Sequence, residues 1–564
     1  MKKTKRIIAT AMAAVMALSM SALAFADTAG VVKSTGTAAV TLTSGSSSSD
    51  DYASAAHSYT AVKLFDLYKV MEADGITQVQ SGGKNVYQYR FTSVWTDALK
   101  TSLQTALNAG GFKIDMNTCE ITKTNDSEVA TQAGNNENAS DAAKLASILA
   151  KFADDNKTTL GTTAMTEGTA SNLQDGYWVI YESGNTANDG SVATKPILLD
   201  VRSSEANGGQ RNLTLKDAKV TLDKKIITPN AHSVNKDDSN IGDVINFEID
   251  TNLPVYQANA FVGGSARFEL VDTLSAGLTL DTTASKFVVT VGGNAVTASS
   301  TINTEAENET WKLTASANSM KIEFDSDFIL AHQGEAVVVT YEAKLNENAV
   351  YNDEDGNPNE VVLTYSNNPM QASDVKTLDD HTESYTYAFD LRKLDGANDA
   401  LLAGAKFQLK NGNDVISFRM GANGEYIVDP AGTVTEIVTT ATGDITIIGL
   451  DEGTYTLHET EAPTGFALLA NDVTVVIDAK EAANEITGAA NVAVSNATVL
   501  KDGEQAEAAN KDTLATGVSD VNVLVRNYHG VTLPETGSIT AIVLTISGLV
   551  TLAGGALVAR KKND

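Results

Sequence analysis

Two lysines occupy positions where the surrounding pattern calls for apolar side chains. In the strand-like segment Val220–Ile226 every second residue faces the same side, so Lys224 shares a face with Val, Leu and Ile. Lys393 alternates in the same way with Phe389 and Leu391. Burial of a lone ammonium group is costly and lowers its pKa, which favours the neutral amine. A neutral amine in a dry core is a nucleophile.

Each lysine has a carboxamide and a carboxyl group further along the chain, and Asn359, Glu459 and Asn527 are again in phase with apolar residues. Asn359 and Asp272 lie in the region after Lys224, and Asn527 and Glu459 lie after Lys393. The lysine nitrogen can attack the side-chain carbonyl of the asparagine when burial keeps the carboxyl group protonated. The product is a Lys–Asn amide, and ammonia is released.

The elements that must position these groups are short strands. From residue 220 onward, alternating strands separated by Gly, Asn and Asp turns are typical of β-sandwiches, and a polar stretch near 374–383 divides the region in two. We therefore predict one sandwich over 220–384 and a second over 385–530.

The region before residue 220 has a different pattern. Residues 59–67 and 173–181 are strand-like, whereas apolar residues recur at helical spacing in 95–107 and 145–152. This predicts an α+β domain over 58–219. Residues 27–57 contain a Ser-rich stretch and are expected to form a flexible leader. The fold class is therefore mainly β, with one mixed domain.

Both ends of the chain carry targeting features. Four basic residues, an apolar stretch and a small-x-small site predict a signal peptide over 1–26, cleaved between Ala26 and Asp27. At the other end, residues 531–564 contain an apolar run at 539–559, long enough to span a bilayer, and a basic tail at 560–562. A pentapeptide precedes the run: Leu533, Pro534, Glu535, Thr536 and Gly537.

Composition excludes several classes of function. Removing the signal peptide and the residues after Thr536 leaves 34 basic and 70 acidic residues, a net charge of about −36, which disfavours nucleic acid and anionic lipid as partners. The single cysteine, Cys119, is expected to be buried and free. Metal-ligand spacings, P-loops and dinucleotide fingerprints are missing from the sequence, so we predict neither a metal nor a cofactor.

Several motifs resemble a known family. The C-terminal tail resembles the LPXTG sorting signal of Gram-positive surface proteins. The YxLxETxAPxGF box at 455–466 resembles collagen-adhesin B-type isopeptide domains, and the Val-Asp-Thr-Leu and Leu-Thr-Tyr-Ser-Asn-Asn-Pro segments resemble the partner isopeptide-forming domain. Residues 58–219 are similar to the N-terminal domain of sortase-assembled backbone pilins.

The resemblance implies roles for the residues above. Lys224 and Asn359 would be the bonded pair of the middle domain, assisted by Asp272, with Lys225 and Asn357 as the alternatives to the pair. In the last domain the pair would be Lys393 and Asn527, assisted by Glu459. A sortase would cleave between Thr536 and Gly537 and transfer Thr536 to an amine of the cell wall or of a neighbouring subunit.

Backbone pilins of this family carry an acceptor lysine late in the first domain, usually in a Tyr-Pro-Lys-Asn setting, which this sequence lacks. Lys216 lies closest to the expected spacing, and Lys219 is the alternative.

The resulting hypothesis is a secreted, peptidoglycan-anchored shaft pilin, not an enzyme toward external substrates. Its expected partners are sortase, further copies of the chain, peptidoglycan and a host ligand, with membrane contact only through the cleaved tail. The alternative is a monomeric wall-anchored adhesin that binds a host matrix protein or glycan.

Overall fold

The computed structural model describes most residues between 30 and 529. The segments within this range that it leaves undescribed are 44–56, 73, 82–83, 126–140, 187–188, 205–210, 216–217, 229, 231, 257–265, 304–307, 370–372, 442–443, 483–484, 495–497, 502–503, 508 and 514–520. The predicted signal peptide, the sorting signal and Lys216 lie outside the described residues. Within the described part, no helix is long and apolar enough to cross a membrane.

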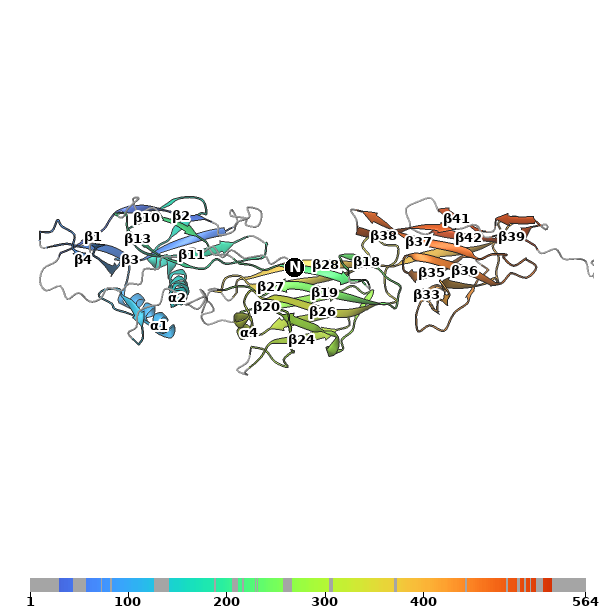
Figure 1. Ribbon diagram of the computed structural model, residues 1–564, viewed down its shortest axis with the longest axis horizontal. Coiled ribbons are helices and arrows are strands. Elements are labelled where there is room, and N and C mark those ends of the chain that lie inside the picture. Colours follow the sequence, from blue (N-terminus) through green and yellow to red (C-terminus); the bar gives the residue numbers. More distant parts are fainter. Residues whose placement is uncertain are drawn as a thin grey trace, which may run out of the picture. The chain divides into compact units, whose positions relative to one another are not determined.

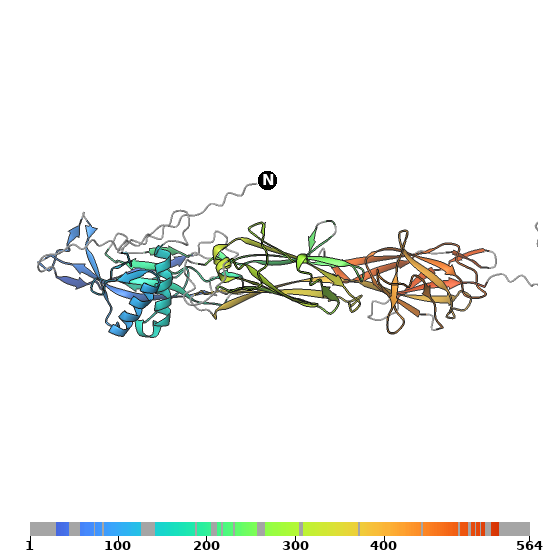
Figure 2. The ribbon, with the colours of Figure 1, turned by 90° about the horizontal axis from the view of Figure 1, so that it is seen from below.

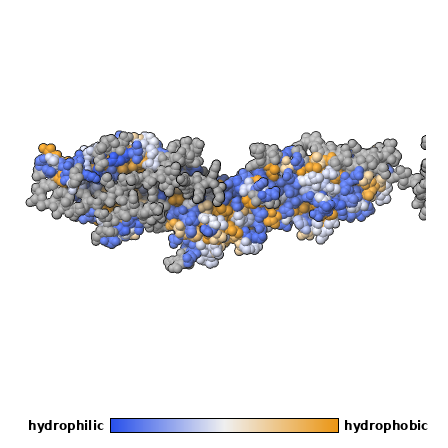
Figure 3. Space-filling model, viewed as in Figure 1, coloured by the Kyte–Doolittle hydropathy of each residue, from blue (hydrophilic) through white to orange (hydrophobic). Residues whose placement is uncertain are grey.

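The chain divides into two compact units. Unit 1 contains Met1–Asn235, Val244–Lys344 and Asn357–Glu383, and unit 2 contains Lys236–Asp243, Leu345–Gly356 and Ser384–Asp564. Figures 1 and 2 show the ribbon from two directions. On the face seen in Figure 3, hydrophilic residues alternate with small apolar areas. The domain boundaries expected from the sequence stay predictions.

The N-terminal part of unit 1 is an α+β domain. Its elements are β1 (Val31–Lys33), β2 (Thr37–Thr43), β3 (His57–Val70), β4 (Gln80–Ser81), β5 (Lys84–Asn85), β6 (Tyr87–Phe91), α1 (Asp97–Ala109), β7 (Phe112–Ile114), β8 (Ile121–Lys123), α2 (Asp141–Asp155), α3 (Lys157–Leu160), β9 (Thr163–Met165), β10 (Ser171–Gln174), β11 (Gly176–Asn185), β12 (Ser191–Val192), β13 (Ile197–Val201), β14 (Arg211–Thr214) and β15 (Ala218–Lys219). The central sheet has the order β1-β3-β11-β13, with β6 and β9 also paired to β3, and a second sheet has the order β10-β2-β14.

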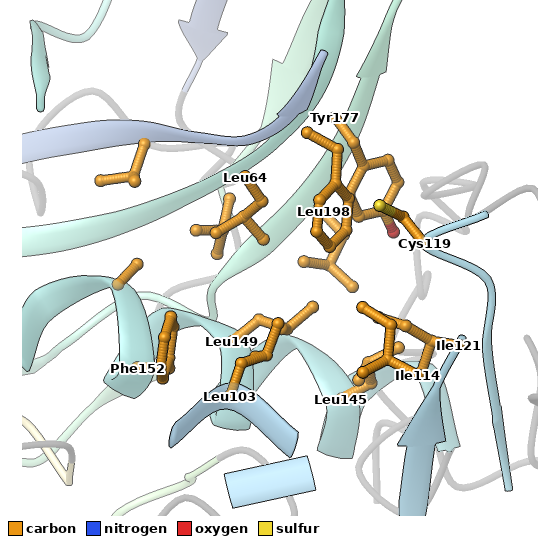
Figure 4. Close-up of a cluster of buried hydrophobic side chains, with 14 of the residues drawn as sticks. Leu64, Leu103, Ile114, Cys119, Ile121, Leu145, Leu149, Phe152, Tyr177 and Leu198 are labelled. Atoms are coloured by element: carbon orange, nitrogen blue, oxygen red, sulfur yellow. The ribbon is translucent and has the colours of Figure 1, made fainter. Parts of the chain in front are cut away.

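The helices form where apolar spacing predicts them. Thr96 caps α1 by accepting a hydrogen bond from the backbone N–H of Leu99, and the leucines of α1 are buried. The helices α1 and α2 cover one side of the central sheet, and their apolar side chains contribute to the cluster shown in Figure 4. Cys119 is fully buried in this cluster, and burial raises the pKa of its thiol to about 12. The expectation of a buried free cysteine is confirmed.

The remainder of unit 1 is a β-sandwich. Its elements are β16 (Leu222–Ile227), β17 (Ser233–Val234), β19 (Val244–Asn252), β20 (Phe268–Leu274), β21 (Leu278–Leu280), the 3-10 turn η4 (Ala284–Lys286), β22 (Val288–Val291), β23 (Asn294–Ala295), β24 (Trp311–Ser316), β25 (Ser319–Phe324), α4 (Ser326–Ala331), β26 (Ala336–Leu345), β27 (Asn357–Ser366) and β28 (Val375–Tyr385). One sheet contains β17-β16-β19-β26-β22-β23, with β21 paired to β26, and the other contains β28-β27-β20-β25-β24.

Unit 2 contains a second pair of sheets. Its elements are β18 (Lys236–Asp238), β29 (Tyr387–Asp395), β30 (Lys406–Asn411), β31 (Asp414–Val415), β32 (Phe418–Met420), β33 (Tyr426–Val428), β34 (Ile437–Val438), β35 (Asp444–Leu450), β36 (Gly453–Glu461), β37 (Val473–Ala482), β38 (Glu485–Val494), β39 (Thr498–Lys501), β40 (Glu504–Glu507), β41 (Ala509–Thr513) and β42 (Val521–Asn527). One sheet has the order β32-β33-β35-β29-β42-β41, and the other has β31-β30-β36-β37-β38, with β34 paired to β30. Apolar side chains of both sheets form one core.

Candidate functional site: two buried lysine clusters

The first cluster lies between the two sheets of the sandwich in unit 1. Lys224 comes from β16 in one sheet, whereas Asp272 on β20 and Asn359 on β27 come from the other. All three side chains are fully buried, so the inward direction predicted for Lys224 is confirmed. In the antiparallel pair β20–β27, Leu274 lies opposite Asn359 and Asp272 lies opposite Val361. Asp272 and Asn359 are therefore diagonal neighbours on one face.

The lysine nitrogen contacts two polar groups. Lys224 Nζ donates hydrogen bonds to Asp272 Oδ2 and to the hydroxyl of Tyr341 on β26. It also lies 5.3 Å from the ring centroid of Phe247 and 5.1 Å from that of Tyr341. Among the described residues, Asp272 Oδ1 and Asn359 Oδ1 are buried and have no hydrogen-bond partner. Both oxygens thus remain able to accept a hydrogen bond.

Burial shifts both titratable groups toward their neutral forms. It lowers the pKa of Lys224, although the nearby Asp272 carboxylate acts in the opposite direction. It raises the pKa of Asp272, against the effect of the Lys224 ammonium. The environment therefore favours the neutral amine and the protonated acid, which are the forms that amide formation needs.

The sequence alternatives have different surroundings. Lys225 lies on the opposite face of β16, and its Nζ is 2.5 Å from Asn235 Oδ1 and 2.8 Å from Asp223 Oδ1. Asn357 is buried on β27, two residues before Asn359. Of the two lysines, only Lys224 contacts Asp272 in the described structure, so the lysine–carboxyl contact favours Lys224.

Tyr341 is the member of this cluster that the sequence analysis missed. Its hydroxyl donates to Asp272 Oδ2 at 2.9 Å and accepts from Asn359 Nδ2 at 3.0 Å. It lies in phase with Val337 and Val339 on β26, a pattern that is typical of an ordinary core aromatic residue. A tyrosine hydroxyl at a fully buried position needs a hydrogen-bond partner, which is the signal that could have drawn attention to it.

The second cluster lies in unit 2. Lys393 on β29, Asn527 at the end of β42 and Glu459 on β36 are all buried. The strands β29 and β42 are parallel neighbours, with Lys393 opposite Val525 and Asp395 opposite Asn527. Glu459 approaches from the other sheet. As in the first cluster, residues far apart in the sequence meet inside a sandwich.

The contacts of the second cluster are direct. Lys393 Nζ donates to Asn527 Oδ1 and, at 3.3 Å, to the carbonyl of Val525, and it lies 3.6 Å from Glu459 Oε1. Asn527 Nδ2 donates to Glu459 Oε1 and Oε2 at 3.0 and 3.1 Å, and to the carbonyl of Ala467 at 2.8 Å. These hydrogen bonds fix the Glu459 carboxyl group beside the Asn527 amide, which the Lys393 amine contacts.

Burial lowers the pKa of Lys393 from 10.5 to about 8, against the opposing effect of Glu459. In an unbonded domain, the folded chain loses this proton near pH 8 and the unfolded chain near pH 10.5. Between these values the unfolded chain binds more protons, so stability rises with pH.

This shift predicts a pH dependence for the unbonded variant Asn527→Ala. From pH 8 to pH 10.5, its free energy of unfolding should rise by up to about 3 kcal/mol relative to that of Asn527→Ala/Lys393→Met, which lacks the titrating amine. Urea unfolding at a series of pH values measures the difference. Parallel pH profiles for the two variants would contradict the prediction.

Of the two candidate acceptor lysines, Lys219 lies within the described residues. Lys219 is exposed on β15, where it pairs with Ser191 of β12. Lys216 lies outside the described residues, as do Ala26, Asp27 and the sorting motif at 533–537.

Three segments of the chain match known families. Residues 241–369 match the Gram-positive pilin backbone subunit 2, Cna-B-like domain, residues 388–491 match a prealbumin-like fold domain, and residues 530–564 match the LPXTG cell wall anchor motif. The trypsin-resistant surface T6 protein of Streptococcus pyogenes serotype M6 is 26% identical over 295 residues, which cover 50% of this chain and 49% of the relative. The chain thus spans about half the length of this curated relative.

One solved structure shows a similar fold. The T6 backbone pilin of serotype M6 Streptococcus pyogenes, described as a modular three-domain structure, has a TM-score of 0.54 at 16% identity, covering 88% of this chain and 99% of that chain. The major pilin SpaD of Corynebacterium diphtheriae has a TM-score of 0.42 at 15% identity, with coverages of 88% and 97%.

Together, the anchor motif and the sandwich domains define a cell-wall-anchored surface protein of Gram-positive bacteria. Within this class the chain is similar to backbone pilins, since residues 241–369 match the pilin backbone model and the T6 backbone pilin has a similar fold. The mainly β fold predicted from the sequence is confirmed.

Proposed function

We propose that this protein is a structural subunit of a covalent pilus, in which each sandwich is closed by a Lys–Asn amide and successive subunits are joined by sortase. One observation carries the proposal: in both sandwiches a buried lysine, asparagine and carboxyl group lie together, although they come from distant parts of the chain. An unreacted buried ammonium would cost stability, so the arrangement is better explained by a reaction than by packing.

The reaction balances without a cofactor. The neutral lysine Nζ attacks the asparagine Cγ, and the carboxyl group stabilises the charge that develops on Oδ1. The new C–N bond forms, the bond from Cγ to Nδ2 breaks, and the proton lost from Nζ leaves on the amide nitrogen as ammonia. Each bond is made once, so the protein is its own single-turnover substrate.

Polymerisation requires a donor and an acceptor. The donor is the Thr536 carbonyl, released from Gly537 by sortase, and the acceptor is a lysine near the end of the N-terminal domain. Lys216 is the first candidate, and the exposed side chain of Lys219 supports it as the second. The last subunit is transferred to peptidoglycan, and the resulting fibre supports adhesion.

An immunoblot of muramidase-released wall extract, boiled in SDS and reductant, tests this function. Because amide bonds survive this treatment, polymerisation should give a ladder of high-mass bands that react with antibody to the mature chain. A single band near the monomer mass would instead indicate a singly anchored adhesin.

Replacing the acceptor lysine should remove the ladder. We expect Lys216→Ala to leave only wall-attached monomer, because Thr536 then has no lysine partner on the next subunit. Lys219→Ala and the exposed Lys84→Ala on β5 serve as comparisons in the same immunoblot. An intact ladder in Lys216→Ala combined with its loss in Lys219→Ala would reassign the acceptor.

A further inference from the structure

The two clusters differ in how the asparagine amide reaches the carboxyl group. In unit 2, Asn527 Nδ2 donates directly to both oxygens of Glu459. In unit 1, Asn359 Nδ2 donates to the Tyr341 hydroxyl, which in turn donates to Asp272 Oδ2. The hydroxyl therefore bridges the amide nitrogen and the acid in unit 1, whereas the amide nitrogen contacts the acid directly in unit 2.

The same hydroxyl also accepts a hydrogen bond from Lys224 Nζ. It is thus in contact with the attacking nitrogen, the leaving nitrogen and the assisting carboxyl group. The Tyr341 ring is held by stacking, with its centroid 5.4 Å from that of Phe247 and 6.3 Å from that of Phe287. Only 2% of the residue is exposed. These contacts fix the hydroxyl and keep solvent from replacing it.

We infer that Tyr341 is a catalytic residue of amide formation in unit 1, and that its hydroxyl passes a proton from Asp272 to the departing amide nitrogen of Asn359. The inference rests on the proposed Lys224–Asn359 bond and adds the route by which the leaving group is protonated.

The proton transfers balance. After Nζ attacks Cγ, the positively charged nitrogen gives one proton to Asp272 and retains one in the new amide. The Tyr341 hydroxyl gives its proton to Nδ2 and takes one from Asp272, so the tyrosine is neutral before and after the reaction. The bond from Cγ to Nδ2 then breaks, and ammonia leaves. Burial raises the pKa of Tyr341, which makes a lasting tyrosinate unfavourable and favours this concerted exchange.

The variant Tyr341→Phe tests the inference because it keeps the stacked ring and removes the hydroxyl. The chain is synthesised in a cell-free system and labelled with a short pulse. Samples are then digested at a series of times, and the amount of the branched peptide joining residues 224 and 359 is measured by mass spectrometry. General acid–base catalysis typically contributes 10²–10⁴-fold, so we expect bond formation at least about 100-fold slower. The Lys393–Asn527 bond of the same chain should form at the wild-type rate and serves as an internal control.

Tyr365→Phe provides a matched control, because Tyr365 is also buried in this sandwich but donates to the carbonyl of Ser191. It should leave the rate unchanged. A wild-type rate in Tyr341→Phe would overturn the role of Tyr341 while leaving the proposed bond intact. A wild-type chain without the branched peptide would overturn both.

If Tyr341→Phe does not fold, incorporation of 3,5-difluorotyrosine at position 341 provides a second test of proton transfer through the hydroxyl. This analogue keeps the ring and the hydroxyl but lowers the pKa of the hydroxyl. A shifted pH–rate profile for the bond in unit 1 is expected. An unchanged profile would contradict proton transfer through this group.

Discussion

Lys393→Met should lower the melting temperature of unit 2 by about 15 °C. The proposed bond would close a loop whose ends are 134 residues apart, and cross-linking a loop of this length stabilises by about 5 kcal/mol in the chain-entropy model. For a domain of this size, each kcal/mol shifts the melting temperature by roughly 3 °C. Methionine fills a similar volume without an amine, so little of the loss should come from a cavity.

Calorimetry of the mature chain measures this effect, and intact mass shows its cause. The wild type should be lighter than its sequence by one ammonia per bond, and Lys393→Met should have one bond fewer. Lys406→Met is the matched control, because Lys406 lies on β30 of the same unit and its ion pair with Glu461 is solvent-accessible. Equal melting temperatures for the wild type and Lys393→Met would contradict a stabilising bond at this lysine.

The two lysines could be found from sequence because strand periodicity is local. A strand alternates sides at every residue, so a lysine in phase with Phe389 and Leu391 must face inward once that face is buried. The same argument applied to their own strands placed Asn359, Glu459 and Asn527 in phase with apolar residues, whereas the resemblance to isopeptide-forming domains implied the pairing of these groups with the lysines. The structure adds their proximity, since Lys393 meets Asn527 only because β29 and β42 pair in parallel.

The contacts of the Tyr341 hydroxyl could not be predicted from its own strand. An aromatic residue in phase with valines predicts burial, and the burial is observed. The position of its hydroxyl depends on the pairing of β26 with β19 and on the facing sheet that carries Asp272, neither of which is a property of the segment itself. The assignment of residues 236–243 to unit 2 also could not be predicted from the segment itself. It depends on contacts such as the hydrogen bond from the Ile241 N–H to the Gly449 carbonyl, which join positions far apart in the sequence.

Asn359→Ala should convert the sandwich of unit 1 from a mechanically inextensible domain into one that unfolds under load. With a Lys224–Asn359 bond, force passes from the Lys224 side chain to the strand β27, so the chain between them carries no tension. Without it, about 135 residues become free to extend, which adds roughly 450 Å of length at about 3.4 Å per residue. The variant keeps Asp272 and Tyr341, so the cluster loses only the electrophile.

Single-molecule pulling of the mature chain should therefore show one additional unfolding step in Asn359→Ala that the wild type lacks. Asn294→Ala is the control, because Asn294 is an exposed asparagine on β23 of the same sandwich and should leave the force curve unchanged. The comparison separates a covalent restraint from ordinary strand pairing: hydrogen bonds between strands yield under sustained force, whereas an amide bond does not. An extra step of this length in the wild type as well would show that the domain is unbonded and would remove the mechanical role proposed for Lys224.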